Sequence, residues 1–207
     1  MGTGGRFKLI VVGDQGVGKS SILHQYVDGN FAGSYVPTVG IDYAAKTVVV
    51  DGATIPLDLW DTAGQEKFRN TFTKSFYRNV HGIIMVFDLT RAATFMNLDD
   101  WFIELGKNVT WPVNMVLVGN KSDITPHQVR ADAVKEFAME RGIPYFETSA
   151  TDYTSVETAF LSLAMAIKDR LGLAGRADLN PAPQPATLQL PSPEQVDDQP
   201  QPRRCAC

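Results

Sequence analysis

A glycine-rich run near the amino end is the first place where residue types and spacing indicate chemistry. Residues 13–20 read GDQGVGKS, which fits the spacing G-x-x-x-x-G-K-[ST], and they follow the short apolar run 7–12. Glycines let backbone N–H groups turn inward around an anion at a helix N-terminus. In this pattern Lys19 reaches the outer phosphates and the Ser20 hydroxyl binds Mg²⁺. The run therefore predicts a phosphate-binding loop, with a chance match in a glycine-rich turn as the alternative.

A second motif further along the chain could supply a metal ligand and a group that positions water. Residues 60–66 read WDTAGQE, and Asp61 ends a segment that is predicted to be a strand. An isolated aspartate at a strand end is usually a turn former, but downstream of a phosphate loop its carboxylate can hold the water shell of Mg²⁺. Gln65 follows Gly64 and carries an amide that can orient an attacking water. We therefore predict a metal role for Asp61 and a catalytic role for Gln65.

Two further motifs, NKSD at 120–123 and ETSA at 147–150, indicate which base would be bound. The carboxylate of Asp123 can accept two hydrogen bonds from guanine, whereas adenine offers no such pair of donors and would leave the carboxylate unpaired. The ETSA segment can supply backbone N–H groups to the guanine oxygen. An isolated NKSD run is often an ordinary turn. The order of the four motifs, each after an expected strand, favours a guanine nucleotide over the ATP of a kinase or ATPase.

These motifs need a scaffold, and the chain before residue 173 alternates strand-like and helix-like segments. Asp51-Gly52 is a strong signal for a two-residue hairpin, so the segments on either side of it are expected to pair antiparallel. The expected strands are 7–12, 45–50, 55–60, 82–88, 113–119 and 144–147. We predict an α/β fold with a mostly parallel six-stranded sheet, one antiparallel hairpin strand and helices on both faces. Ligands bind at the carboxyl ends of the strands in such folds.

Two helix starts are suggested by capping residues. Thr125 can cap a helix whose first position is Pro126. Residues 154–157 read TSVE, which fits a capping box. One apolar face at helical spacing follows it: Val156, Ala159, Phe160, Leu163, Ala164, Ile167 and Leu171.

Composition separates a globular body from a tail. The chain has 207 residues, 44% of them hydrophobic and 20% charged, and a net charge of −4 that gives no basis for binding nucleic acid. Its apolar runs are too short to span a membrane. Seven of the twelve prolines lie within Pro181–Pro202, and we predict a globular domain over 1–173 and a flexible Pro-rich tail over 174–207. Both cysteines lie in the last three residues, which suits a reducing compartment.

In this order the four motifs resemble the Ras superfamily of small GTPases, and the Rab family most closely. The resemblance covers about Phe7 to Leu171. Four stretches are similar to Rab segments in particular: VGIDY at 39–43, KTVVVDG at 46–52, EKFR at 66–69 and MVFDLT at 85–90. The resemblance implies the fold of a P-loop NTPase-type small GTPase domain.

The resemblance also assigns site residues. Thr38 stands where the family has a switch threonine that contacts Mg²⁺ and the γ-phosphate, and Phe31 stands where it has an aromatic ring against guanine. The implied catalytic residues are Gln65, Lys19 and Thr38, and the implied Mg²⁺ residues are Ser20, Thr38 and Asp61. The implied contacts to GTP or GDP come from Gly13, Asp14, Gln15, Gly16, Val17, Gly18, Lys19, Ser20, Ser21, Phe31, Tyr35, Thr38, Gly64, Asn120, Lys121, Asp123, Ser149 and Ala150. The implied effector surface comprises Ile41, Tyr43, Trp60 and Phe76.

The function implied by the resemblance is that of a switch. Bound GTP would order the loops around Thr38 and Gly64, and slow hydrolysis to GDP would release them. The implied partners are an exchange factor, a GTPase-activating protein, a GDI-type escort that recognises prenyl groups, and effectors that bind the GTP form. By analogy with the family, the process is intracellular vesicle traffic.

The last residues, Cys205-Ala206-Cys207, are similar to the Cys-x-Cys ending on which Rab proteins carry two geranylgeranyl lipids. A CaaX box would need cysteine at position 204, where Arg204 stands. Two lipid chains anchor a protein firmly where one gives marginal binding. The resemblance thus implies attachment to the cytoplasmic face of an intracellular membrane, with cycling through the cytosol. The alternative is that the two terminal cysteines carry no lipid and have no function.

Three features depart from the family's pattern. The segment between Gln65 and Phe76 is one residue longer than usual, which would turn a helix there by about 100° and rotate Phe76. Thr151 stands where the family has a lysine whose stem helps cover the base, so nucleotide binding could be looser. Gln15 occupies a loop position over the γ-phosphate where Rab proteins carry a small residue. It could crowd Gln65 and an incoming arginine finger, giving a GTP-binding scaffold with impaired hydrolysis, or turn harmlessly into solvent.

Overall fold

The computed structural model describes residues 6–29, 41–62 and 76–173. Its strands are β1 (Phe7–Val12), β2 (Ile41–Val50), β3 (Ala53–Thr62), β4 (Gly82–Asp88), β5 (Asn114–Asn120) and β6 (Tyr145–Thr148). Its helices are α1 (Lys19–Asp28), α3 (Ala92–Met96), α4 (Leu98–Asn108), α5 (Ala131–Glu140) and α6 (Tyr153–Arg170). The predicted tail, 174–207, lies outside the described residues.

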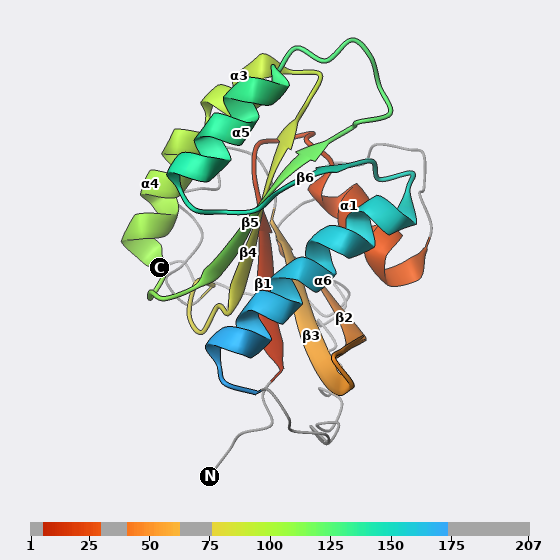
Figure 1. Ribbon diagram of the computed structural model, residues 1–207, viewed down its shortest axis with the longest axis vertical. Helices are drawn as coiled ribbons and strands as arrows, with labels where there is room; N and C mark the ends of the chain where they lie inside the picture. Colours follow the sequence, from red (N-terminus) through yellow and green to blue (C-terminus); the bar gives the residue numbers. More distant parts are fainter. Residues whose placement is uncertain (1–5, 30–40, 63–75, 174–207) are drawn as a thin grey trace, which may run out of the picture.

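The six strands form one sheet in the order β2-β3-β1-β4-β5-β6, and every neighbouring pair is parallel except β2 and β3. Helices α1 and α6 cover one face of the sheet, and α3, α4 and α5 cover the other (Figure 1). The predicted fold class is therefore confirmed. In this arrangement the carboxyl ends of the parallel strands lie together at the upper edge in Figure 1.

Because the sheet has apolar residues on both faces, its strands could be predicted from the sequence as continuous apolar runs. All seven residues of β4 are buried, and five of the six in β1 are. A strand covered on both faces becomes a continuous apolar run, as expected for a parallel sheet between helical layers. The predicted bounds of β1 and β4 match the structure, and β5 and β6 each begin one residue later than predicted.

The hairpin joins β2 and β3 through the two residues Asp51 and Gly52. Their φ angles are +46° and +76°, the left-handed conformation that a tight turn between antiparallel strands requires. The ladder extends from Val50 opposite Ala53 to Ile41 opposite Thr62, so both strands are longer than predicted. The extra pairs include the exposed polar residues Asp42 and Thr54, so they gave no apolar run to read. At the turn, the Lys168 ammonium bonds the Asp51 carboxylate at 2.8 Å and ties α6 to the hairpin.

The predicted helix start at Thr125 and Pro126 is wrong, because α5 begins only at Ala131. The preceding segment is held instead against Leu89, the residue that follows β4. The backbone N–H groups of Gln128 and Val129 both donate to the Leu89 carbonyl, at 2.9 and 3.2 Å. This tertiary contact keeps the chain in turns past the local capping signal.

The predicted start of α6 also needs correction by two residues. Asp152 is the N-cap, and its Oδ1 accepts from the Thr154 N–H at 3.0 Å. Glu157 does not complete a capping box, because its carboxylate accepts from the Tyr153 hydroxyl at 2.8 Å. The predicted apolar face is buried as far as Ile167. Leu171 is the exception, with 42% of its surface exposed, because it lies after the helix has ended.

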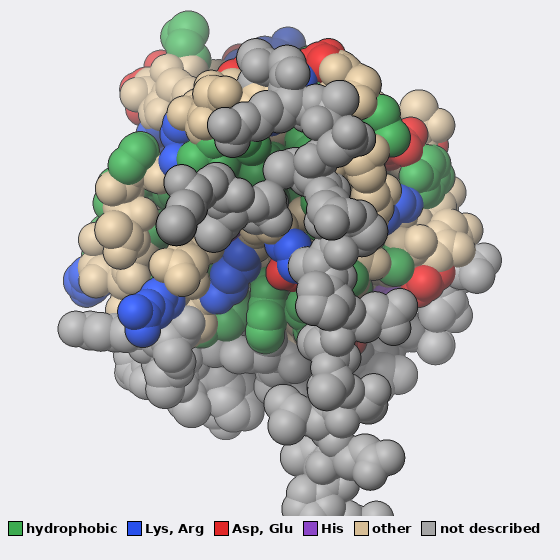
Figure 2. Space-filling model, turned by 90° about the horizontal axis from the view of Figure 1, so that it is seen from below, with side chains coloured by type: hydrophobic (Ala, Val, Ile, Leu, Met, Phe, Trp, Pro, Cys, Tyr) green, Lys and Arg blue, Asp and Glu red, His purple; other side chains and the backbone are tan. Residues whose placement is uncertain are grey.

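The lower edge of the sheet carries the end of α6 and the beginning of β1. The Arg170 guanidinium donates to the Asn114 side chain at 2.5 Å and to the His81 carbonyl at 3.2 Å, which attaches the helix end to the sheet. Lys and Arg side chains lie beside hydrophobic ones on this face (Figure 2). Among the residues that the structure describes, no helix combines the length and apolarity needed to cross a bilayer.

Candidate nucleotide site

The phosphate loop runs from the end of β1 to the start of α1, and its shape depends on glycine. Gly13, Gly16 and Gly18 have φ angles of +141°, +74° and +97°. A Cβ on Gly13 would lie 2.1 Å from the Val86 carbonyl oxygen, so the loop packs directly on the backbone of β4. Positive φ angles at several positions of a short loop let its N–H groups turn inward, which makes an anion-binding nest.

Lys19, the first residue of α1, provides a cation within this loop. Its side chain is buried, and its ammonium donates to the carbonyl oxygens of Gly13 and Asp14 at 3.0 and 2.9 Å. The positive charge is therefore held along the loop rather than in solvent. A buried ammonium next to an anion nest is well suited to the outer phosphates of a nucleotide.

Ser20 and Asp61 come together although 41 residues separate them in the sequence. The parallel register pairs Val11 with Asp61, which brings the end of β3 beside the phosphate loop. There the Ser20 hydroxyl donates to the Asp61 carboxylate, which is 2% exposed. A hydroxyl and a carboxylate oxygen are the ligand types that Mg²⁺ prefers, so the pair fits the predicted metal site.

Asn120 joins residues 120–123, which we call the base-reading loop, to the phosphate loop. It ends β5, it is 1% exposed, and its amide nitrogen donates to the Val17 carbonyl at 2.8 Å. Its amide oxygen accepts from the Thr148 hydroxyl at 3.2 Å. The Ser122 N–H donates to the Thr148 carbonyl at 3.0 Å. The motifs NKSD and ETSA therefore meet the phosphate loop at the carboxyl ends of β5, β6 and β1.

Asp88 at the end of β4 is a site residue that the sequence analysis missed. Its carboxylate is fully buried and lies 2.6 Å from the Lys121 ammonium. The Thr90 N–H and hydroxyl also donate to it, at 2.9 and 2.6 Å. Burial alone would raise the pKa of Asp88, but the hydrogen bonds from Lys121 and Thr90 outweigh it and hold the pKa below its ordinary value. The only sequence signal was an aspartate at the end of a wholly apolar strand.

The remaining base-reading residues lie on the two neighbouring loops. Asp123 is exposed, so its carboxylate is accessible to a base. Ser149 and Ala150 are buried, and the Ser149 N–H donates to the Ser155 hydroxyl at 3.2 Å. Thr151, at the position where the family has lysine, shares a hydrogen bond of 2.6 Å with the Ser149 hydroxyl.

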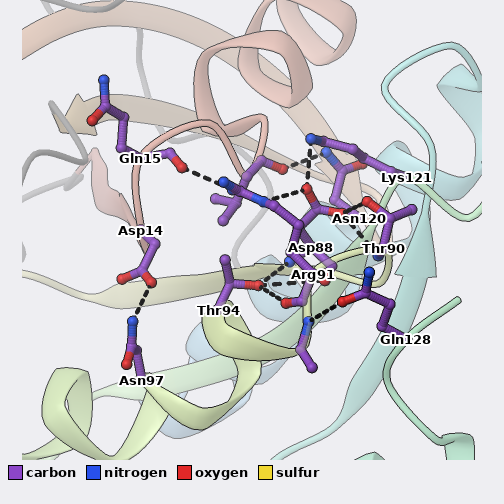
Figure 3. Close-up of polar contacts among 12 residues, drawn as sticks. Asp14, Gln15, Asp88, Thr90, Arg91, Thr94, Asn97, Asn120, Lys121 and Gln128 are labelled. Atoms are coloured by element: carbon purple, nitrogen blue, oxygen red, sulfur yellow. Dashed lines mark hydrogen bonds and ion pairs between the residues drawn. The ribbon is translucent and has the colours of Figure 1, made fainter.

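Asp14 and Gln15 contact the helical segment behind the phosphate loop (Figure 3). The buried Asp14 carboxylate accepts from the Asn97 amide at 2.7 Å and from the Trp101 indole N–H at 2.9 Å. The Arg91 guanidinium donates to the Gln15 carbonyl at 2.8 Å. Because its carboxylate is turned to α4, a nucleotide contact from Asp14 would have to come from its backbone. No sequence motif marked these three partners.

The aromatic residues of the implied effector surface form one row. Tyr43 lies edge-on to Trp60 with ring centroids 5.1 Å apart, and Trp60 lies edge-on to Phe76 at 6.4 Å. Phe76 lies in a turn and keeps its place in this row, while the segment with the extra residue lies outside the described residues. Tyr43, at one end of the row, is 40% exposed, and Phe76, at the other end, is only 5% exposed. Ile41 is the first residue of β2, two residues before Tyr43.

Several predicted site residues lie outside the described residues. They are Phe31, Tyr35, Thr38, Gly64, Gln65, Cys205 and Cys207. Within the described ranges, no group of three or more His, Cys, Asp or Glu side chains could hold a metal ion by itself.

Comparison with known proteins identifies the family. The family model described as "Ras family" matches residues 8–169. The chain is 44% identical to "GTP-binding protein YPTM2" of Zea mays over 203 residues, which covers 97% of this chain and 95% of that protein. It is 48% identical to "Ras-related protein RABD2a" of Arabidopsis thaliana over 166 residues, or 80% and 81% of the two chains. The chain therefore belongs to the Ras family of small GTPases, in its Rab branch, whose members bind GTP with Mg²⁺ and hydrolyse it to GDP.

Proposed function

We propose that this GTPase is a membrane-anchored switch that recruits effectors in its GTP form and so regulates vesicle traffic. The observation that carries the proposal is the convergence of three segments at the carboxyl edge of the sheet. The phosphate loop touches Asp61 through Ser20, and it touches the base-reading loop through Val17 and Asn120. Phosphate, metal and base contacts can therefore come from one site.

Within that site each group has a role that its position supports. Lys19 and the loop N–H groups bind the outer phosphates, while Ser20 and Asp61, together with Thr38, hold Mg²⁺. The metal, when bound, neutralises charge on the phosphates. Gln65 orients the attacking water, and Asp123 reads the guanine edge. Output is through the row of Tyr43, Trp60 and Phe76, which effectors would contact when the neighbouring loops are ordered.

Nucleotide displacement tests the choice of base. Fluorescent GDP bound to the purified protein is challenged with GTP, ATP or inosine triphosphate, which lacks the guanine amino group. We expect GTP to compete best, with ATP at least about 1,000-fold weaker, because a polar site that loses its partners rejects the wrong ligand by orders of magnitude. In Asp123→Ala the preference for GTP over inosine triphosphate should disappear. Displacement by ATP at concentrations similar to GTP would contradict the proposal.

Membrane attachment by geranylgeranyl groups on Cys205 and Cys207 is tested by imaging in cells. A tagged wild-type chain is compared with Cys205→Ser, Cys207→Ser and the double variant. Because one chain gives marginal binding and two give firm binding, the single variants should be partly cytosolic and the double variant fully so. A double variant that stays on the same membrane would exclude this anchor.

The second candidate function is a GTP-binding scaffold with impaired hydrolysis. The conformation of Gln15 is compatible with it. Its side chain is exposed and points away from the Asp88 and Arg91 cluster behind the loop (Figure 3). Single-turnover hydrolysis is measured for wild type and Gln15→Ser, with and without an activating protein. An arginine finger is worth about 10³–10⁵ in rate, so crowding should appear mainly in the stimulated reaction. Equal stimulated rates in the two proteins would rule out crowding by Gln15.

A further inference from the structure

We propose that Arg91, Asn97 and Trp101 form a rear clamp on the phosphate loop that slows nucleotide release. They are positioning residues, because they act on the nucleotide through Asp14 and Gln15. The inference deepens the proposed nucleotide site and rests on it. Residues 91–101 would then control how long GDP or GTP stays bound.

The first half of the clamp is the Asp14 carboxylate. Two side chains that donate to it, Asn97 and Trp101, are four residues apart at the start of α4, so they share one face of the helix. Trp101 is 1% exposed and packs in the core with Leu98 and Leu105. The indole N–H is therefore fixed in position. Hydrogen bonds to an ionised acceptor are stronger than those between neutral groups. A buried carboxylate that accepts two of them therefore holds its loop in place.

The second half is the Gln15 carbonyl. Arg91 donates to it from Nη2 at 2.8 Å, while its Nε donates to the Asp88 carboxylate at 3.0 Å. Asp88 is fully buried and also pairs with Lys121. The guanidinium is thus held by the same carboxylate that holds the lysine of the base-reading loop. Arg91 connects the two loops that would close around a nucleotide.

The direction of these contacts leaves the anion side of the loop available. Arg91 bonds a backbone carbonyl and the α4 residues bond a side chain, so neither half of the clamp uses the N–H groups that an anion nest needs. Gly16 adjoins Arg91 as well, since a Cβ there would lie 3.6 Å from Nη2. The clamp therefore holds two consecutive loop residues from behind.

The loop needs such support because of its composition. Gly13, Gly16 and Gly18 give it the left-handed angles of the nest, and glycine loses more conformational freedom on ordering than any other residue. A loop already fixed by Arg91 and Trp101 has less of this freedom left to lose when a nucleotide binds. Preorganisation of this kind raises affinity chiefly by slowing dissociation.

The test measures dissociation of fluorescent GDP from the full chain in the presence of Mg²⁺. Trp101→Phe keeps an aromatic ring and removes the donor, and Arg91→Ala removes the other half. We expect release to be about tenfold faster in each, the effect of one charge-assisted hydrogen bond. Arg91→Lys, which keeps a cation and a donor, should recover part of the difference. Arg91→Ala also serves if Trp101→Phe fails to fold, since the Arg91 side chain is 46% exposed.

A matched control separates clamping from helix packing. Leu105→Ala removes a fully buried side chain one turn after Trp101 without touching Asp14. Its thermal stability should fall at least as far as that of Trp101→Phe, while GDP release stays close to wild type. If Leu105→Ala releases GDP as fast as Trp101→Phe, or if Trp101→Phe and Arg91→Ala release it at the wild-type rate, the clamp is refuted. A wild-type protein that binds no GDP would instead refute the nucleotide site itself.

Discussion

Gly18 lies where the phosphate loop touches the base-reading loop, and we predict that this contact admits no side chain. Its φ is +97°, and a Cβ would lie 2.3 Å from the Asn120 amide nitrogen. That amide is held at both ends, by Val17 and Thr148, so it cannot move without losing a hydrogen bond. Gly18→Ala should lower the free energy of unfolding by about 2 kcal/mol or more and speed GDP release about tenfold. Urea unfolding and fluorescent GDP dissociation measure the two effects.

Gly29 supplies the matched control at the other end of α1. It has a φ of +67°, and among the described residues no atom lies within 4 Å of a Cβ built on it. Gly29→Ala should therefore show the backbone cost alone, about 1 kcal/mol, with unchanged GDP release. If the two alanine variants released GDP at the same rate, the contact with Asn120 would have no part in holding the nucleotide.

At the scale of elements, α1 and α6 pack through a pair of aromatic rings. Tyr26 and Phe160 are stacked with centroids 3.9 Å apart and planes 12° from parallel, and Phe160 is fully buried. Phe160→Ala should lower the free energy of unfolding by about 3–5 kcal/mol, because it removes a large side chain and leaves a cavity. Met165→Ala on the same helix, where 45% of the side chain is exposed, should change it by no more than about 0.5 kcal/mol. Equal losses in denaturant unfolding would show that the stack is not a packing centre.

The elements also show which features could be read from the sequence. Strands buried on both faces, such as β1 and β4, are apolar throughout, so their bounds follow from hydrophobicity alone. The start of α5 could not be read in this way. Thr125 and Pro126 form a valid local signal, but it is overridden by hydrogen bonds to Leu89, which is distant in the sequence. Local capping preferences are worth about 1 kcal/mol, so a pair of tertiary hydrogen bonds can reverse them.

In the candidate site too, some residues could be predicted from the sequence and others could not. Its motifs were readable because a phosphate loop and a base-reading loop each need particular residues within a few positions. The partners of Asp14 could not be predicted from the sequence. Trp101 is 87 residues away, and no sequence motif distinguishes it from any other hydrogen-bond donor at that position. The aspartate in GDQGVGKS is predicted to contact the nucleotide, and since the structure turns its carboxylate to α4, that contact would come from its backbone.

At the scale of the whole molecule, α6 separates the nucleotide site from the start of the tail. The helix begins just after the ETSA loop and ends at Arg170, at the opposite edge of the sheet (Figure 1). Its 18 residues span about 27 Å. A membrane anchor at the end of the tail would therefore pull on the edge of the domain that is far from the nucleotide and from Asp61.

That lower edge contains a histidine whose charge state should affect the stability of the whole domain. His81 is half-buried, and its Nδ1 accepts from the Lys8 N–H at 3.0 Å, which requires the neutral ring. Burial lowers the pKa of His81, and the charges of Arg170 and Lys8 lower it further, against a smaller opposing effect from Asp58. The unfolded chain, with a histidine pKa of about 6.5, then binds a proton more readily than the folded protein.

The pH dependence follows from this difference. Well above about pH 6.5 both states are neutral at His81 and its contribution is constant, whereas as the pH falls through this value the contribution is progressively lost until the folded pKa is reached. The free energy of unfolding, measured in urea between pH 5 and 8, should therefore fall more steeply with acid in wild type than in His81→Gln. Carboxylates titrate in both proteins, so the difference between the two curves isolates the histidine. A difference between the two curves that stays flat from pH 8 to pH 5 would contradict the assignment.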